Sequence, residues 1–358
     1  MERLHIAFFG PTNSGKSTLV NAICGQEVSL VSPVPGTTTD PVRKIAELPD
    51  LGPCVLIDTA GSDDESILGQ ERQRLTRAIM DETDVAVVLN GAEPGTDKIE
   101  DLLSTLKENG IPTVQYQWGQ SIDSLIKSIA AVAPKEESKY LTGDLVGPGS
   151  NVLLVMPQDK EAPKGRLILP QVQILRELLD RGCVPHSCTP DSLQAALGSL
   201  SHLPDLVITD SQVFGLVNRT IPQDWALTSF SVLLAAAKGD LRAFVAGAKA
   251  IDALRPGARV LIAEACTHVP DTEDIGRVKI PAMLRKRVGE LEVDIAAGNN
   301  FPEDLSPYSL IIHCGACVAN ARLVRSRIRK AAAAGVPITN YGLAIAYLQG
   351  ILSRISLP

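Results

Sequence analysis

The octapeptide Gly10-Pro-Thr-Asn-Ser-Gly-Lys16-Ser17 follows directly on the apolar run Leu4 to Phe9. It fits the pattern G-x-x-x-x-G-K-S, in which a strand leads into a glycine-rich loop and then into a helix beginning near Ser17. Backbone N–H groups of such a loop bind phosphates, and the helix N-terminus adds a positive partial charge. The sequence therefore predicts a nucleoside-triphosphate site lined by Gly10, Asn13, Ser14, Gly15, Lys16, Ser17 and Thr18. Lys16 is expected to reach the β- and γ-phosphates and Ser17 to bind Mg²⁺.

Two further segments predict a GTPase-type switch. The apolar run 55–57 ends in Asp58-Thr-Ala-Gly61, where the Asp58 carboxylate can hold Mg²⁺ through water and the Gly61 N–H can bond the γ-phosphate. The hydroxyl-rich segment 35–40 lies between the two motifs. Its Thr37 and Thr38 are expected to contact the nucleotide, and Thr38 to bind Mg²⁺ only while the γ-phosphate is present. The residues expected to act in hydrolysis are Lys16, Asn13, Thr38, Asp58 and Gly61.

The order of these motifs resembles the translation-factor-like GTPases with Asn in the phosphate loop, among them tRNA-modifying and ribosome-assembly GTPases. That resemblance implies that Asn13 helps to bind a K⁺ ion in the place of an arginine finger. Ser62 stands where Ras-type enzymes have a water-orienting Gln, so a different catalytic element is required. A monovalent cation would supply it.

The guanine-recognition segment of G domains is missing. An N-K-x-D segment is expected after residues 110–114, where the chain reads Gln115-Tyr-Gln-Trp-Gly-Gln-Ser121. The nearby polar substitutes, Gln115, Gln117 and Gln120, carry neutral amides, which form weaker hydrogen bonds than a carboxylate. The sequence therefore predicts a poor preference for GTP over ATP, or weak binding of both.

Composition excludes several classes of protein. A net charge of −7 over 358 residues argues against a general nucleic-acid binder, whose affinity depends on neutralising phosphates. No apolar run approaches the roughly 18 residues of a membrane span. We expect no signal peptide, because the predicted first strand begins close to residue 1. Seven cysteines, an odd number, indicate a reducing compartment and thiolate chemistry. We expect a cytoplasmic protein with no nucleic-acid or membrane partner.

Alternating strand and helix patterns predict three α/β domains with parallel sheets. Their expected bounds are 1–140, 141–238 and 239–358, with linker at 134–139 and 143–150. In the second domain, 226–237 is expected to be a helix. In the third, a basic helix is expected at 318–334, with Arg322, Arg325, Arg327, Arg329 and Lys330 on its solvated face. Four other cysteines lie in apolar contexts and are expected in the core: Cys24, Cys54, Cys183 and Cys188.

Two predicted strands of the third domain end in metal-binding residue types. Cys266 and His268 follow strand 259–265, and His313, Cys314 and Cys317 follow strand 308–313. Because ligands gather at the carboxyl ends of parallel strands, the three cysteines can reach one point. Cys317 would also stand at the N-terminus of helix 318–334, where the helix dipole favours a thiolate. Three Cys and one His suit zinc, and three Cys with an open fourth position suit a [4Fe–4S] cluster, so the spacing leaves both possible.

C-x-H at 266–268 and H-C-x-x-C at 313–317, together with an N-terminal P-loop GTPase, resemble the [FeFe]-hydrogenase maturation GTPases, the HydF family. Similar segments occur at 156–159, 162–171, 274–281 and 335–342. The resemblance implies a GTPase domain, a dimerisation domain and a cluster domain. It matches Cys266, Cys314 and Cys317 to the cluster cysteines, with His268 and His313 as a possible fourth ligand or as hydrogen-bonding neighbours.

The resemblance also implies a function. The protein would be a scaffold that uses GTP, Mg²⁺ and K⁺, carries a [4Fe–4S] cluster, and delivers a two-iron precursor to apo-[FeFe]-hydrogenase. Its partners would be that hydrogenase, the radical-SAM hydrogenase maturases and a second copy of itself, in a homodimer or larger assembly. The alternative is a nucleotide-regulated RNA-processing or assembly GTPase with a structural zinc.

Overall fold

The structure is a computed structural model that describes residues 3–25, 41–61, 67–90, 97–134, 140–158, 165–265 and 274–358, with the backbone alone at 67–73 and 97–98. The chain divides into two compact units, Met1–Glu136 and Glu137–Pro358. None of the helices in these ranges is long and apolar enough to cross a membrane.

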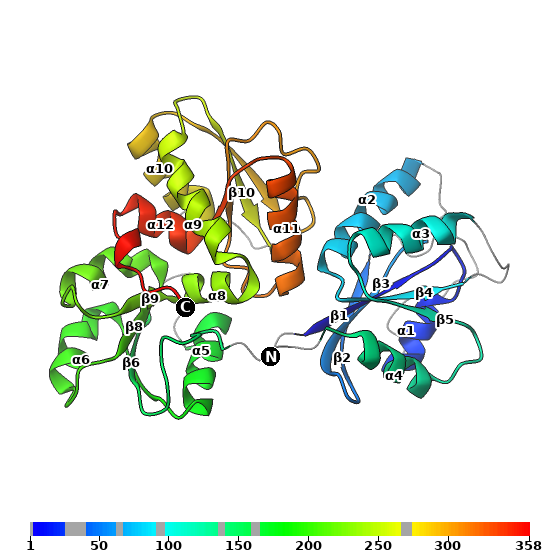
Figure 1. Cartoon of the computed structure of the whole chain (residues 1–358), viewed down its shortest axis with the longest axis horizontal. Coiled ribbons are helices and arrows are strands. Elements are labelled where there is room, and N and C mark those ends of the chain that lie inside the picture. The colour runs from blue at the N-terminus through cyan, green and yellow to red at the C-terminus, as the bar shows by residue number, and fades with distance from the viewer. Residues whose placement is uncertain are drawn as a thin grey trace. The chain divides into compact units, whose positions relative to one another are not determined.

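The first unit is a five-stranded sheet with helices on both faces (Figure 1). The strands follow the order β2-β3-β1-β4-β5, and only β2 is antiparallel to its neighbour. The strands are β1 (Leu4–Phe9), β2 (Val42–Leu48), β3 (Gly52–Asp58), β4 (Val85–Leu89) and β5 (Thr113–Tyr116). The helices are α1 (Lys16–Cys24), α2 (Ile67–Glu82), α3 (Asp97–Glu108) and α4 (Ile122–Val132).

Alternation along β1 explains the layers of this unit. Successive side chains of a strand point to opposite faces. Ile6 and Phe8 accordingly enter the core that contains the buried residues of α1 and α4, whereas Ala7 and Phe9 enter the core that contains those of α2 and α3. This is the predicted P-loop fold, in which the carboxyl ends of β1 and β3 meet at one edge.

The second unit contains two parallel four-stranded sheets. The β6 sheet has the order β7-β6-β8-β9 and the β10 sheet the order β11-β10-β12-β13. The strands are β6 (Asn151–Val155), β7 (Val184–Cys188), β8 (Leu206–Thr209), β9 (Leu227–Ser229), β10 (Arg259–Glu264), β11 (Glu292–Ala297), β12 (Leu310–His313) and β13 (Ile338–Asn340). The helices are α5 (Leu169–Asp180), α6 (Leu193–Ser199), α7 (Phe214–Thr220), α8 (Phe230–Lys238), α9 (Leu241–Lys249), α10 (Ile280–Val288), α11 (Ala321–Ala333) and α12 (Tyr341–Leu348), with a short π-helix at Ile275–Lys279.

The two sheets of the second unit share one hydrophobic core. That core joins Leu153 and Val207 of the β6 sheet to Leu261 and Ile311 of the β10 sheet. The chain end returns to the β6 sheet, where the Ser356 N–H donates to the Leu227 carbonyl over 2.7 Å. Although each sheet is built from its own sequence segment, the two halves are stabilised as one body.

Two predicted elements of this unit are wrong in detail. Residues 227–229 of the expected helix 226–237 form β9, and the helix α8 begins only at Phe230, where the Ser229 side chain accepts the Val232 N–H. Helix α11 begins at Ala321 rather than 318, because the Asn320 side chain caps it by accepting the Leu323 N–H. Strand β11 was not predicted.

The four other cysteines have the expected structural character. Cys54 and Cys183 are buried, and Cys24 and Cys188 are partly buried. Burial raises the pKa of all four thiols, that of Cys54 to about 11. These thiols are therefore protonated at neutral pH.

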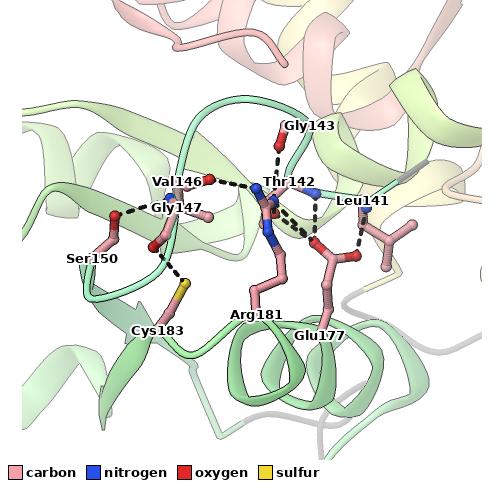
Figure 2. Close-up of polar contacts among 9 residues, drawn as sticks. All are labelled: Leu141, Thr142, Gly143, Val146, Gly147, Ser150, Glu177, Arg181 and Cys183. Atoms are coloured by element: carbon pink, nitrogen blue, oxygen red, sulfur yellow. Dashed lines mark hydrogen bonds and ion pairs between the residues drawn. The ribbon is translucent and has the colours of Figure 1, made fainter. Parts of the chain in front are cut away.

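The expected linker 143–150 is an ordered part of the second unit. Figure 2 shows how Glu177 of α5 and Arg181, the residue that follows this helix, hold the segment. The Glu177 carboxylate accepts the N–H groups of Leu141 and Thr142, and the Arg181 guanidinium donates to the carbonyls of Gly143 and Val146. Leu141, Leu145 and Val146 then pack on the core of the β6 sheet.

Replacing Arg181 with Met should therefore destabilise the second unit by about 3 kcal/mol, since it leaves the carbonyls of Gly143 and Val146 without their donor and the Glu177 carboxylate without its cationic partner. The side chains of Arg181 and Glu177 are only 10% and 12% exposed. The measurement is urea unfolding followed by Trp225 fluorescence in a Trp118→Phe background.

The same helix provides the matched control. Arg176 and Asp180 form an ion pair of the same i,i+4 spacing with side chains 64% and 59% exposed. Arg176→Met should cost less than about 1 kcal/mol. Equal losses in the two variants would show that the Arg181 contacts do not stabilise the segment.

Candidate functional site

The phosphate loop lies between β1 and α1 and is closely held by its own side chains. Lys16 is buried, and its Nζ donates to the carbonyls of Gly10 and Pro11 over 3.0 and 2.7 Å. The Ser17 Oγ donates to Asp58 Oδ2 over 2.6 Å. The predicted phosphate-binding Lys and the two predicted Mg²⁺-binding groups are thus together at the carboxyl ends of β1 and β3.

Gly61 lies directly against this loop. A Cβ atom placed on Gly61 would come within 2.1 Å of the Thr12 Oγ1 atom and 2.7 Å of the Thr12 backbone nitrogen. Only glycine therefore allows the chain leaving β3 to approach the phosphate loop so closely. This is the position that the D-x-x-G motif requires for an N–H group facing a γ-phosphate.

Asn13 stands exposed at the tip of the loop with a φ of 60°. Asn adopts this left-handed conformation more readily than most residues. Ser14 is buried, and Thr18 is exposed in the first turn of α1. The other predicted residues of this site, Thr37 and Thr38, and the neighbouring Ser62 lie outside the described residues.

Trp118 is the residue of this site that sequence reasoning missed. Its indole Nε1 donates to the Ser14 carbonyl over 2.9 Å. Gln115, Gln117 and Gln120, the polar substitutes expected for base recognition, are all exposed. The signal in the sequence was the tryptophan on the segment that replaces N-K-x-D.

The second candidate site follows β12 in the other unit. Cys314 comes directly after the strand, and its Sγ accepts the N–H groups of Ala265 and Ala316 over 3.1 and 3.4 Å. Burial raises the pKa of the Cys314 thiol, while the two N–H groups and the nearby Arg327 charge act in the opposite direction. Since β10 pairs with β12, Ala265, the residue before Cys266 in the sequence, lies beside Cys314.

Lys238, the last residue of α8, holds the loop that contains Cys314 and Cys317. It is only 4% exposed. Its Nζ donates to the carbonyls of Ala316, Cys317 and Ala319 over 2.9, 3.3 and 2.7 Å. A buried ammonium group with three carbonyl acceptors fixes the path of the loop.

Both ring nitrogens of His313 have partners within the protein. His313 is 1% exposed, its Nδ1 lies 2.8 Å from the Cys314 carbonyl, and its Nε2 lies 3.1 Å from a guanidinium nitrogen of Arg327. Burial and the Arg327 charge lower its pKa to about 3. The ring is therefore neutral, with Nδ1 donating and Nε2 accepting, which leaves neither nitrogen for a metal in this arrangement. Of the two roles expected for His313, the geometry favours the hydrogen-bonding one.

Two expectations about helix α11 are wrong. Arg327 does not lie on a solvated face: it is 1% exposed and donates to the carbonyls of Glu264 and Gly298. Cys317 precedes the helix by several residues, so the Asn320 cap, and not the cysteine, stands at the helix N-terminus. Arg327 is buried because its guanidinium satisfies the carbonyl at the end of β10 and the His313 ring.

The described residues bring together two of the three expected cysteines. Cys266 and His268 lie outside these residues, and within the described ranges no group of three His, Cys, Asp or Glu side chains forms a metal site. The glutamate at the end of β10 has a structural partner instead, because Arg277 donates to both carboxylate oxygens of Glu264 over 3.0 and 2.6 Å.

Models of known protein families match the two units separately. The model of the hydrogen maturase F dimerization domain matches residues 141–239, and that of the hydrogen maturase F tetramerization domain matches 242–358. A model described as 50S ribosome-binding GTPase matches 5–116, ending where the N-K-x-D segment would begin.

Individual curated relatives match a smaller part of the chain. GTPase Der of Clostridium acetobutylicum is 39% identical over 113 residues, which is 30% of this chain and 26% of that protein. GTPase Der of Clostridium tetani is 41% identical over 98 residues, 26% of this chain and 22% of that protein. The chain thus spans about a quarter of the length of these curated relatives.

Among solved structures, Era in complex with MgGDPNP and a 16S ribosomal RNA segment matches with 18% identity and a TM-score of 0.29, covering 58% of this chain and 93% of that one. The hydrogen maturase F models match nearly all of the second unit, beside a GTPase domain in the first. The chain therefore belongs to the hydrogen maturase F (HydF) family of hydrogenase maturation GTPases.

Proposed function

We propose that this chain couples a nucleotide-hydrolysing switch to an iron–sulfur scaffold that delivers a two-iron precursor to apo-[FeFe]-hydrogenase. The observation that supports it best is the setting of Cys314, whose sulfur accepts two backbone N–H groups at the end of β12. Such N–H bonds stabilise a sulfur that carries negative charge, as a cluster ligand does.

The residues present fit a [4Fe–4S] cluster. Cys266, Cys314 and Cys317 would hold three irons, and the bound cluster would leave the fourth iron open to an exchangeable ligand. Around it, Lys238 orients the loop and Arg327 and His313 hold the strand ends. The Arg327 charge acts on the sulfur of Cys314, where positive charge favours a thiolate over a thiol.

The nucleotide site would act as the switch. Lys16 would exchange its two loop carbonyls for the β- and γ-phosphates, and Ser17 and Asp58 would hold Mg²⁺. Thr37 and Thr38 would join only in the triphosphate state. We further propose that the partners are the apo-hydrogenase, the radical-SAM maturases and a second copy of this chain, in the cytoplasm.

The cluster proposal predicts a difference between two cysteines. After anaerobic purification, the parent protein should be brown, absorb near 400 nm and contain about four irons and four sulfides per chain. Cys314→Ser should lose most of the iron and remain folded. Cys188→Ser, which changes a partly buried cysteine of β7, should keep the iron.

Unchanged iron in Cys314→Ser would remove this residue from the ligand set. A colourless parent protein with about one zinc per chain would favour the alternative, an assembly or RNA-processing GTPase with a structural metal.

The switch proposal predicts activation by potassium. If Asn13 helps to place K⁺ against the charge that develops on the phosphate, hydrolysis should be about tenfold or more faster in KCl than in NaCl. Because Asn13 has a φ of 60°, Asn13→Gly removes the amide without straining the loop. That variant should hydrolyse at the same slow rate in both salts and still bind nucleotide with Mg²⁺. Equal rates for the parent protein in KCl and NaCl would contradict the proposal.

A further inference from the structure

The turn between β5 and α4 brings an aromatic ring onto the phosphate loop. Trp118 is joined to the loop by the hydrogen bond from its indole to the Ser14 carbonyl. A Cβ atom placed on Gly15 would lie 2.3 Å from the Cζ2 atom of Trp118. The indole therefore lies directly against the residue that precedes the phosphate-binding Lys16.

The ring is held in place and yet remains accessible. Tyr116 contacts it edge-on, with ring centroids 5.7 Å apart and planes at 78°. The Tyr116 hydroxyl donates to the Gln120 carbonyl, and the Gln117 N–H donates to the Gln120 side chain, so the turn closes on itself. Trp118 is nevertheless 54% exposed. A large apolar side chain that is fixed at its edge and open to solvent offers a surface to a ligand.

The order of the strands indicates which part of a nucleotide would meet it. Asp58, the predicted Mg²⁺ group, ends β3 on one side of β1, whereas Trp118 follows β5 on the other side. With the γ-phosphate directed toward Asp58 and Gly61, the nucleoside extends from the loop toward β4 and β5. The base then reaches the turn that carries Trp118.

We propose that Trp118 is the base-binding surface of the nucleotide site, stacking its indole on the purine of a nucleoside triphosphate. This inference rests on the proposed binding of nucleotide to the phosphate loop. Aromatic stacking uses the face of the base, which every purine has, and does not read its hydrogen-bonding edge. The site therefore accepts guanine and adenine nucleotides with similar affinity.

The test compares ligands with and without a base. In the full chain with Trp225→Phe, Trp118 is the only remaining tryptophan. GTP and ATP, with Mg²⁺ and K⁺, should quench its fluorescence and bind within a few-fold of one another. Inorganic tripolyphosphate should bind more weakly than either nucleotide.

Variants separate stacking from the hydrogen bond to Ser14. By calorimetry, Trp118→Ala should weaken GTP and ATP about five- to hundredfold and leave tripolyphosphate unchanged, which also shows that the phosphate loop is intact. Trp118→Phe keeps an aromatic face without the N–H and should retain most of the nucleotide affinity.

Two outcomes would overturn the inference. Unchanged or tighter GTP binding by Trp118→Ala, with tripolyphosphate binding retained, would refute stacking while leaving nucleotide binding in place. Failure of GTP, ATP and tripolyphosphate alike to bind the parent protein would refute both the nucleotide site and the stacking.

Discussion

The buried ammonium group of Lys238 is the contact on which the second unit depends most. Helix α8 follows the last strand of the β6 sheet, and the loop that Lys238 binds follows β12 of the β10 sheet. A buried charge is costly unless hydrogen bonds compensate it, and here three carbonyls do so. If the two sheets moved apart, the charge would lose those acceptors. The same contact therefore fixes the packing of the sheets and the path of the cysteine loop.

Local patterns predicted much of the fold and the part of each site that lies on a continuous segment. The phosphate loop, the Asp58–Gly61 motif and the strand before Cys314 have the predicted places because apolar runs and glycine spacing are local properties. The predictions that failed concern residues whose positions depend on partners far away in the sequence. Arg327 resembles its basic neighbours along α11, and its burial follows from the end of β10 and from His313. Residues 227–229 have an apolar pattern that suits a helix, but they pair with β8.

The two candidate sites use the same structural principle. Each lies at the carboxyl ends of adjacent parallel strands, where side chains and backbone N–H groups converge. At the first, β1 and β3 bring together Lys16, Ser17 and Asp58. At the second, β10 and β12 bring the Ala265 N–H to the Cys314 sulfur. In both, a buried lysine binds loop carbonyls, which gives the loop a defined shape.

The role of Lys238 is tested most directly by the rate at which a chelator removes iron from the anaerobically purified protein. Lys238→Met should lose iron about tenfold faster than the parent, as is typical when a partner of the ligand-bearing residues is removed. Lys249→Met, a control at the exposed end of the next helix α9, should match the parent. Equal iron loss by Lys238→Met and the parent protein would contradict the claim that the buried ammonium group holds the cysteine loop ready for a cluster.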